Sequence, residues 1–211
     1  DVVKEVSEKG TDVTILDAGS GVTFFPYYIN YMFNKTKVHC CDYDGSLPNV
    51  YNHLNSNTNI DVEFSTADLK NLPYKKNAFD AIYCISVLEH TNDYEKIIEE
   101  FYRILRPNGA LIITFDISLD GKRKINVDQA NILLTALAKR FVKNNNFYTN
   151  IHSQVTLPNV FTTHIANDID NRLLPWGKKS FFKRMVNYLK TGSTAILPPL
   201  LTVYCLRLTK N

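Results

Sequence analysis

Three aspartates in the first third of the chain have the spacing of a ligand-binding edge. Asp17 precedes a turn that contains Gly19 and Gly21, and Asp42 and Asp68 each follow an apolar or β-branched run. A glycine turn between a strand and a helix lets a ligand approach the backbone, and the helix start presents free N–H groups. A carboxylate in that turn suits an ammonium group, whereas one at a strand end can accept both hydroxyls of a ribose.

The dipeptide Asp68-Leu69 adds the chemistry of adenine recognition. The carboxylate of Asp68 can accept a hydrogen bond from the exocyclic amine, while the backbone N–H of Leu69 donates to a ring nitrogen. Each aspartate taken alone has an alternative role as a turn-forming or helix-capping residue. Three aspartates at successive strand ends favour a common site, because ligands of open α/β sheets bind at the carboxyl ends of the strands.

Strand and helix signals alternate through the first 120 residues. We expect strands at residues 13–16, 37–41, 62–66, 79–85, 110–115 and 201–208, and helices at 22–33, 46–54, 94–105 and 127–142. Repeated β-α-β units with apolar strands predict an α/β fold with a mostly parallel, doubly wound sheet between two helical layers. Arg106-Pro107-Asn108-Gly109 is expected to stop a helix before the fifth strand.

Composition restricts the class of protein further. The chain has 211 residues, of which 45% are hydrophobic and 21% charged, which excludes a disordered tail and suits one globular domain. We interpret Cys40, Cys41, Cys84 and Cys205 as core thiols of a reducing, cytoplasmic compartment, since they lack C-x-x-C spacing. We expect no signal peptide and no membrane span, because the apolar stretch 195–206 is short and contains two prolines.

Several motifs together resemble a known family. They are Ile15-Leu16-Asp17-Ala18-Gly19-Ser20-Gly21, Asp42, Ala67-Asp68-Leu69, Phe79-Asp80-Ala81-Ile82, Val87-Leu88-Glu89-His90 and Ile104-Leu105-Arg106-Pro107-Asn108-Gly109-Ala110-Leu111. With them, residues 13–116 resemble the class I S-adenosylmethionine-dependent methyltransferases, close to their small-molecule branch. The family usually has a third glycine where this chain has Thr23, which affects the tightness of the turn. A nicotinamide enzyme is disfavoured, because Phe24 occupies the place of the last glycine of a dinucleotide fingerprint.

The resemblance implies a Rossmann-like fold with seven strands, the last antiparallel, and S-adenosylmethionine as the cofactor. It implies that the Asp17 turn wraps the methionine part, that Asp42 binds the ribose and that Asp68 with Leu69 binds the adenine. The exit of the fourth strand passes beside the methionine part. The complete expected cofactor set is Asp17, Ala18, Gly19, Ser20, Gly21, Asp42, Tyr43, Asp68, Leu69, Cys84, Ile85 and Ser86.

We expect a single methyltransferase domain over residues 1–211. Residues 1–120 would form the cofactor-binding core, and residues 121–211 an acceptor-side elaboration with an insertion of short helices around 156–195. Residues 201–208 would form the final strand.

Three side chains are candidates for catalysis. His90 can act as a general base on a substrate hydroxyl, since its ordinary pKa is near neutrality; its alternative role is to brace a helix start. Asp116 is a second candidate base at the end of the fifth strand, with a turn-forming role as the alternative. His164 lies in the insertion, either over the substrate or simply at the surface. A metal site is not expected, because Ser86 replaces the acid that assists one in some relatives.

Charge is distributed unevenly and suggests the acceptor. Residues 1–120 carry a net charge of −8 and residues 121–211 a net charge of +11. The sequence therefore predicts O-methylation of a small anionic molecule, such as a sugar, a glycolipid or a nucleotide-linked intermediate. The cations expected to bind this anionic acceptor are Lys178, Lys179, Lys183 and Arg184, in the amphipathic stretch that follows Trp176. This stretch is alternatively a surface helix, a lid or a peripheral membrane contact.

Two other functions remain open. Methylation of RNA or protein is one, although no appended module or open groove with aromatic and basic residues is evident, and nucleic acid is not expected as a partner. A non-catalytic domain that binds the cofactor or a partner is the other, and the intact set of Asp17, Asp42 and Asp68 argues against it.

Overall fold

The computed structural model describes residues 12–123, 125–141, 150–155, 160–170 and 198–211, together with residues 172, 185 and 189. Contacts between residues divide the chain into two compact units. The first comprises residues up to 115 with 132–149 and 205–211, and the second comprises 116–131 with 150–204. The predicted cofactor residues all lie in the first unit.

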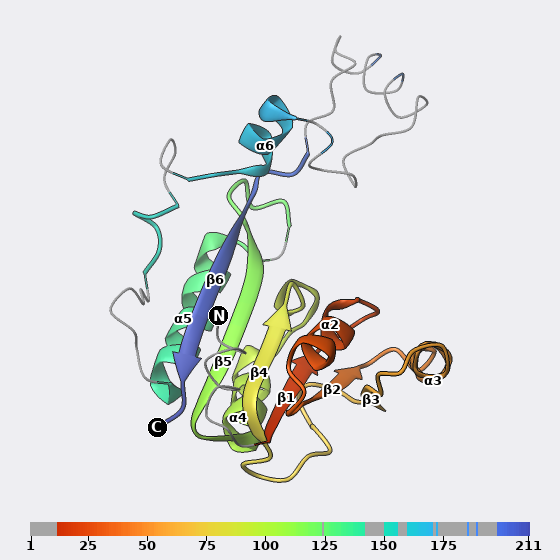
Figure 1. Cartoon of the computed structure of the whole chain (residues 1–211). Coiled ribbons are helices and arrows are strands. Elements are labelled where there is room, and N and C mark those ends of the chain that lie inside the picture. Colours follow the sequence, from red (N-terminus) through yellow and green to blue (C-terminus); the bar gives the residue numbers. More distant parts are fainter. Residues whose placement is uncertain are drawn as a thin grey trace. The chain divides into compact units, whose positions relative to one another are not determined.

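A six-stranded sheet with the order β3-β2-β1-β4-β5-β6 organises the fold (Figure 1). Its strands are β1 (Val13–Ala18), β2 (Thr36–Asp42), β3 (Glu63–Thr66), β4 (Phe79–Ile85), β5 (Leu105–Ser118) and β6 (Leu201–Thr209). Strands β1 to β5 pair in parallel, whereas β6 is antiparallel to β5: Asn108 N–H donates to Lys210 O, and Lys210 N–H donates to Gly109 O. The predicted fold class and the antiparallel last strand are confirmed. The expected count of seven strands is wrong for the described residues, which form six.

The helices follow the predicted order with shifted ends. They are α2 (Phe25–Met32), α3 (Leu47–Ser56), the short 3₁₀ turn η1 (Leu88–His90), α4 (Tyr94–Ile104), α5 (Val127–Arg140) and α6 (Thr163–Ile169). Helix α2 begins three residues later than expected, because the glycine turn continues to Phe24 and Pro26 suits the first helical turn.

The segment Arg106-Pro107-Asn108-Gly109 corrects one prediction. Helix α4 ends at Ile104 as expected, but these four residues belong to strand β5 rather than to a separate loop. Leu105 already pairs with Phe79 of β4, and Lys210 of β6 bonds to the backbone of the segment. The strand continues through a local stop signal because partners from distant parts of the chain satisfy its backbone groups.

Apolar side chains cover both faces of the sheet in the first unit. On one face, Ile15, Val38 and Tyr83 form a buried cluster with Ile29 of α2 and Tyr51 of α3. Helices α4 and α5 lie on the opposite side of the sheet from α2 (Figure 1). This is the layered arrangement that β-α-β alternation predicts, and it leaves the carboxyl ends of the strands free to form a site.

The four cysteines are all free thiols. Cys40, Cys41 and Cys84 are buried, as predicted, and burial raises the pKa of Cys41 to about 12. The prediction that all four are core residues is wrong for Cys205, which is exposed because it faces outward from the last strand while its neighbour Leu206 is buried.

In the second unit, α6 is joined to the residues that precede β6. Thr162 caps the helix by accepting a hydrogen bond from Ile165 N–H, and Nε2 of His164 lies 2.8 Å from Pro198 O. Trp176 and the cations Lys178, Lys179, Lys183 and Arg184 lie outside the described residues. No helix in the part of the chain that the structure describes is both long enough and apolar enough to cross a bilayer.

Candidate functional site

The strand order brings the predicted cofactor residues to one edge of the sheet. Strand β1 lies between β2 and β4, so successive crossovers leave it in opposite directions. The register places Asp17 beside Cys40 of β2 and Tyr83 of β4, and Asp42 beside Thr66 of β3. The carboxyl ends of four strands therefore meet at a topological switch point, where ligands of this kind of sheet bind.

The turn after β1 has the backbone that its glycines predict. Gly19 has φ +79° and Gly21 has φ +50°, both in the left-handed region. A Cβ at Gly19 would lie 2.6 Å from Cγ1 of Val87, in the segment after β4, so a larger residue does not fit there. A Cβ at Gly21 would have nothing within 4 Å, and this open space beside the turn is available to a ligand.

Asp42 connects two loops of this edge. Its Oδ2 accepts a hydrogen bond of 2.9 Å from Gly21 N–H, and its Oδ1 accepts one of 3.0 Å from Asp44 N–H. Its backbone carbonyl accepts a third from Ala67 N–H at 2.8 Å. Each carboxylate oxygen has a further lone pair, so Asp42 can still accept the two hydroxyls of a ribose.

Asp17 is the buried acid of the edge, with 5% of its surface exposed. Burial raises its pKa to about 7; the Tyr83 hydroxyl lowers that pKa, and the charge of Asp42 raises it. The Tyr83 hydroxyl faces this carboxyl yet forms no complete hydrogen bond with any described group. A carboxyl in this state would ionise readily once a cationic group approached it.

Asp68 and Leu69 form a compact turn after β3. Oδ1 of Asp68 accepts a 2.9 Å hydrogen bond from Lys70 N–H, and its Oδ2 lies 3.6 Å from Lys70 Nζ. Leu69 is buried, whereas Tyr43, on the neighbouring loop, is 79% exposed. The turn-forming role of Asp68 is thus present in the structure, and its contact with adenine stays a prediction.

The carboxyl end of β4 and the residue that follows it form another part of the candidate site. Cys84 is buried, Ile85 is 45% exposed, and Ser86 has φ +54°. Ser86 N–H donates to both the carbonyl and the hydroxyl oxygen of Thr114, at 3.1 Å each. These two bonds hold a serine in a backbone region that costs about 1 kcal/mol or more.

The three predicted catalytic residues fall in different units. His90 is exposed at the end of η1, in the first unit. Asp116 lies within β5, two residues before its end, and His164 contacts Pro198 O; both belong to the second unit. The catalytic role of each of them stays a prediction. No group of three or more His, Cys, Asp or Glu side chains suited to a metal lies in the described part of the chain.

Two tyrosines of the site were not predicted from the sequence. The Tyr51 hydroxyl of α3 lies 3.0 Å from Gly21 O and 3.0 Å from Ser20 Oγ, while Tyr83 faces Asp17. The alternation of β4 could have shown that Tyr83 shares a sheet face with Asp17. No local signal distinguishes Tyr51 from an ordinary aromatic residue of a buried helix face.

Comparison with known proteins relates part of the chain to one family. Residues 16–113 match the family described as "Methyltransferase domain". Norajmaline N-methyltransferase of Rauvolfia serpentina is 40% identical over 52 residues, which is 25% of this chain and 18% of that protein. An uncharacterised protein of Methanocaldococcus jannaschii is 33% identical over 106 residues, 50% of this chain and 42% of that one. The chain thus spans less than half the length of these relatives.

A solved structure extends the likeness to the whole fold. The putative sarcosine dimethylglycine methyltransferase of Galdieria sulphuraria superposes with a TM-score of 0.63 at 17% identity, covering 100% of this chain and 84% of that one. At this identity the match supports the fold alone. The matched domain, which covers just under half of the chain, and the fold together support the class I S-adenosylmethionine-dependent methyltransferase family that the sequence resembles.

Proposed function

We propose that this chain binds S-adenosylmethionine at the carboxyl edge of the first unit and transfers its methyl group to a small-molecule acceptor. The observation that carries the proposal is the geometry of Asp42. Its two oxygens are oriented by Gly21 N–H and Asp44 N–H at 2.9 and 3.0 Å, at the place where the family binds a ribose. Two charge-assisted bonds to a ribose would also link the ligand to the glycine turn.

The other groups at this edge fit the same cofactor. Asp17 offers a buried carboxyl to an ammonium group, and the open space beside Gly21 leaves room for a ligand against the backbone. When bound, S-adenosylmethionine supplies a methyl group already activated by its sulfonium. The protein then has to exclude water and to hold the acceptor in line with that methyl group.

An oxygen acceptor would also require removal of a proton. His90 is our proposed base, because it is exposed in η1, which directly follows the exit of β4. His90→Ala should then lower turnover by roughly 10²-fold or more and leave cofactor affinity unchanged. An unchanged turnover would favour an acceptor atom that needs no base, such as an amine nitrogen, as in the N-methyltransferase of Rauvolfia serpentina.

The charge pattern supports an anionic acceptor. Residues 121–211 have an excess of cations that the cofactor does not require, since its methionine end is cationic at the sulfonium and amine. Replacing Lys178, Lys179, Lys183 and Arg184 together by Gln should raise the KM for such an acceptor, most strongly at low salt. Cofactor affinity should not change. A KM insensitive to salt and to the four substitutions would contradict the anionic acceptor.

Thermal-shift titration tests the cofactor directly. S-Adenosylmethionine and S-adenosylhomocysteine should both raise the melting temperature in a concentration-dependent way, and NAD should not. A larger stabilisation by NAD, or none by any of the three ligands, would contradict the proposal. Binding without turnover of any acceptor would instead support the non-catalytic alternative.

A further inference from the structure

Gly21 forms a side-chain hydrogen bond at its N–H and another at its carbonyl oxygen. Its N–H donates to Asp42 Oδ2 at 2.9 Å, and its carbonyl oxygen lies 3.0 Å from the Tyr51 hydroxyl. A carbonyl has no proton, so Tyr51 must be the donor in the second bond. The Ser20 hydroxyl, 3.0 Å from the same phenolic oxygen, completes a small network beneath the turn.

Tyr51 is itself fixed with little freedom. The residue is 1% exposed, and its ring stacks on Phe64 of β3 with a centroid distance of 4.4 Å and an interplanar angle of 19°. The ring of Tyr27 of α2 is also stacked with that of Tyr51, at a centroid distance of 6.5 Å. A ring held by two aromatic neighbours can place its hydroxyl without losing further side-chain entropy.

The hydroxyl of Tyr51 makes a hydrogen bond to the glycine turn that the aromatic ring alone cannot make. Gly21 has φ +50° and no atom within 4 Å of the position of a Cβ, so packing at that position does not fix its backbone, and its hydrogen bonds have to do so. The hydroxyl of Tyr51 restrains the carbonyl, and this in turn fixes the N–H that orients Asp42. We propose that Tyr51 is a positioning residue for cofactor binding, which acts through Gly21 on the ribose-binding carboxylate of Asp42.

The inference rests on the proposed function, in which Asp42 binds the ribose. Under it, Tyr51 has no contact with the ligand and changes affinity only through the orientation of Asp42. The consequence is specific: loss of the hydroxyl should weaken the part of the affinity that depends on the ribose hydroxyls. A tyrosine that merely fills the core would weaken all ligands of the site equally.

The test compares S-adenosylhomocysteine with its 2′-deoxy analogue by calorimetry in wild type and Tyr51→Phe. Phenylalanine retains the stacked ring and removes only the hydroxyl. Wild type should prefer the ribose form by about tenfold, the value of one hydrogen bond to a charged group. In Tyr51→Phe this preference should fall to about threefold, whereas in an Asp42→Asn background Tyr51→Phe should cause no additional change in preference.

Tyr27→Phe is the matched control. Tyr27 belongs to the same aromatic stack, but its hydroxyl donates to Asn55 Oδ1 at 2.9 Å rather than to the glycine turn. This variant should keep the tenfold preference. Because the readout is a ratio of two affinities, a modest loss of stability in either variant does not affect it.

Three results would overturn the inference, and the first of them separates it from the proposed function. If wild type binds S-adenosylhomocysteine but Tyr51→Phe keeps the full preference for the ribose form, Tyr51 is only a core residue and the proposed function stands. If wild type does not bind S-adenosylhomocysteine, both proposals fail. A fall in preference in Tyr27→Phe equal to that in Tyr51→Phe would also overturn the inference, because it would show a general effect of the stack.

Discussion

The two edges of the sheet in the first unit differ in how completely their polar groups are hydrogen-bonded. At the carboxyl edge, Asp17 is buried with a raised pKa, the Tyr83 hydroxyl lacks a complete hydrogen bond, and Ser86 has a left-handed backbone. At the amino edge, the Nζ of Lys210 donates to Tyr102 O and Leu105 O at 2.6 Å each and to Asn77 Oδ1 at 3.0 Å.

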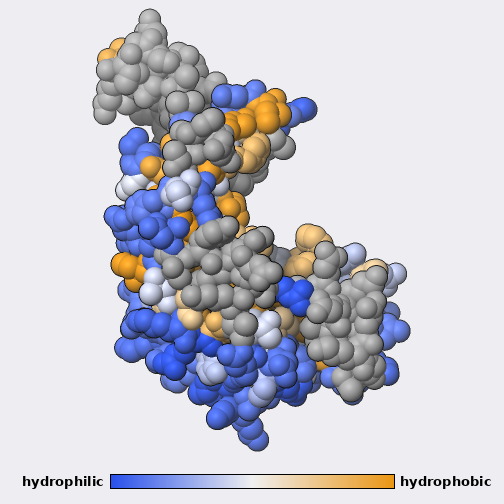
Figure 2. Space-filling model, turned by 90° about the vertical axis from the view of Figure 1, so that its left-hand side faces the viewer, coloured by the Kyte–Doolittle hydropathy of each residue, from blue (hydrophilic) through white to orange (hydrophobic). Residues whose placement is uncertain are grey.

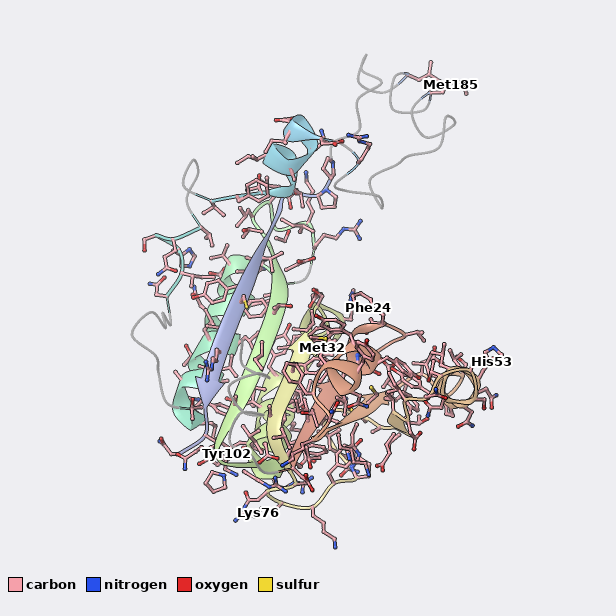
Figure 3. The ribbon with its side chains drawn as sticks, in the orientation of Figure 1. Phe24, Met32, His53, Lys76, Tyr102 and Met185 are labelled. Atoms are coloured by element: carbon pink, nitrogen blue, oxygen red, sulfur yellow. The ribbon has the colours of Figure 1, made fainter. Side chains whose placement is uncertain are left out.

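At the amino edge, charged side chains bond to backbone carbonyls and to one another. Lys210 also lies 4.6 Å from the centroid of the Tyr102 ring, and Arg103 forms two 2.7 Å bonds to Glu100 and further bonds to backbone carbonyls. Figure 3 places Tyr102 and Lys76 at this lower end and Phe24 toward the other edge, and Figure 2 shows a mostly hydrophilic surface at the lower end. Buried polar groups whose hydrogen bonds are complete stabilise a fold, whereas buried polar groups with incomplete hydrogen bonds indicate a candidate ligand site.

The largest effect is expected from Asp17 and depends on pH. A folded-state pKa raised to about 7 means that the ligand-free fold holds the proton more tightly than the unfolded chain does. The free energy of unfolding should therefore fall as pH rises from about 4 to 7, by up to roughly 3–4 kcal/mol. Asp17→Asn should remove this fall, so that the variant is more stable than wild type at pH 8. Urea unfolding between pH 4 and 8 measures the difference.

The same substitution should weaken the binding of S-adenosylmethionine, because a neutral amide attracts an ammonium group less than a carboxylate does. A stabilised variant with reduced affinity would be direct evidence that the carboxyl edge is arranged for binding at the expense of stability. Parallel stability curves for wild type and Asp17→Asn across this pH range would contradict the account.

A smaller loss is expected at Gly19. Gly19→Ala would place a Cβ 2.6 Å from Cγ1 of Val87 at φ +79°, and the combined strain should lower the free energy of unfolding by about 3 kcal/mol. Adding Val87→Ala should restore the part due to the clash but not the part due to backbone conformation. Chemical denaturation of the two variants measures both parts. If Val87→Ala gives no recovery in the double variant, the close approach of the two loops is not the reason for glycine.

At the amino edge we expect the reverse pattern. Lys210→Met should lower the free energy of unfolding by about 2 kcal/mol, because the carbonyls of Tyr102 and Leu105 lose their donor. Affinity for S-adenosylmethionine should not change. Lys76→Met, an exposed lysine near the same end, is the control and should alter stability by less than about 0.5 kcal/mol. A loss of ligand affinity in Lys210→Met would show that the two edges are not independent.

The contrast also explains what the sequence could and could not predict. Asp17, Asp42 and Asp68 were predicted from local order, because each lies at or just beyond the carboxyl end of a strand and parallel strands end at a common edge. Tyr51 and Lys210 were not predicted, because their partners are distant in the chain: Gly21 for the tyrosine, Leu105 and Asn77 for the lysine. Local patterns show which side chains are buried but not where their polar atoms bond.

Calorimetric titration of S-adenosylmethionine into wild type, Asp42→Ala and Lys210→Met tests the central claim most directly. We expect one bound ligand in wild type, an affinity at least tenfold weaker in Asp42→Ala, which loses its charge-assisted bonds, and an unchanged affinity in Lys210→Met. Equal affinities in wild type and Asp42→Ala would contradict the claim that the carboxyl edge of the sheet binds the cofactor.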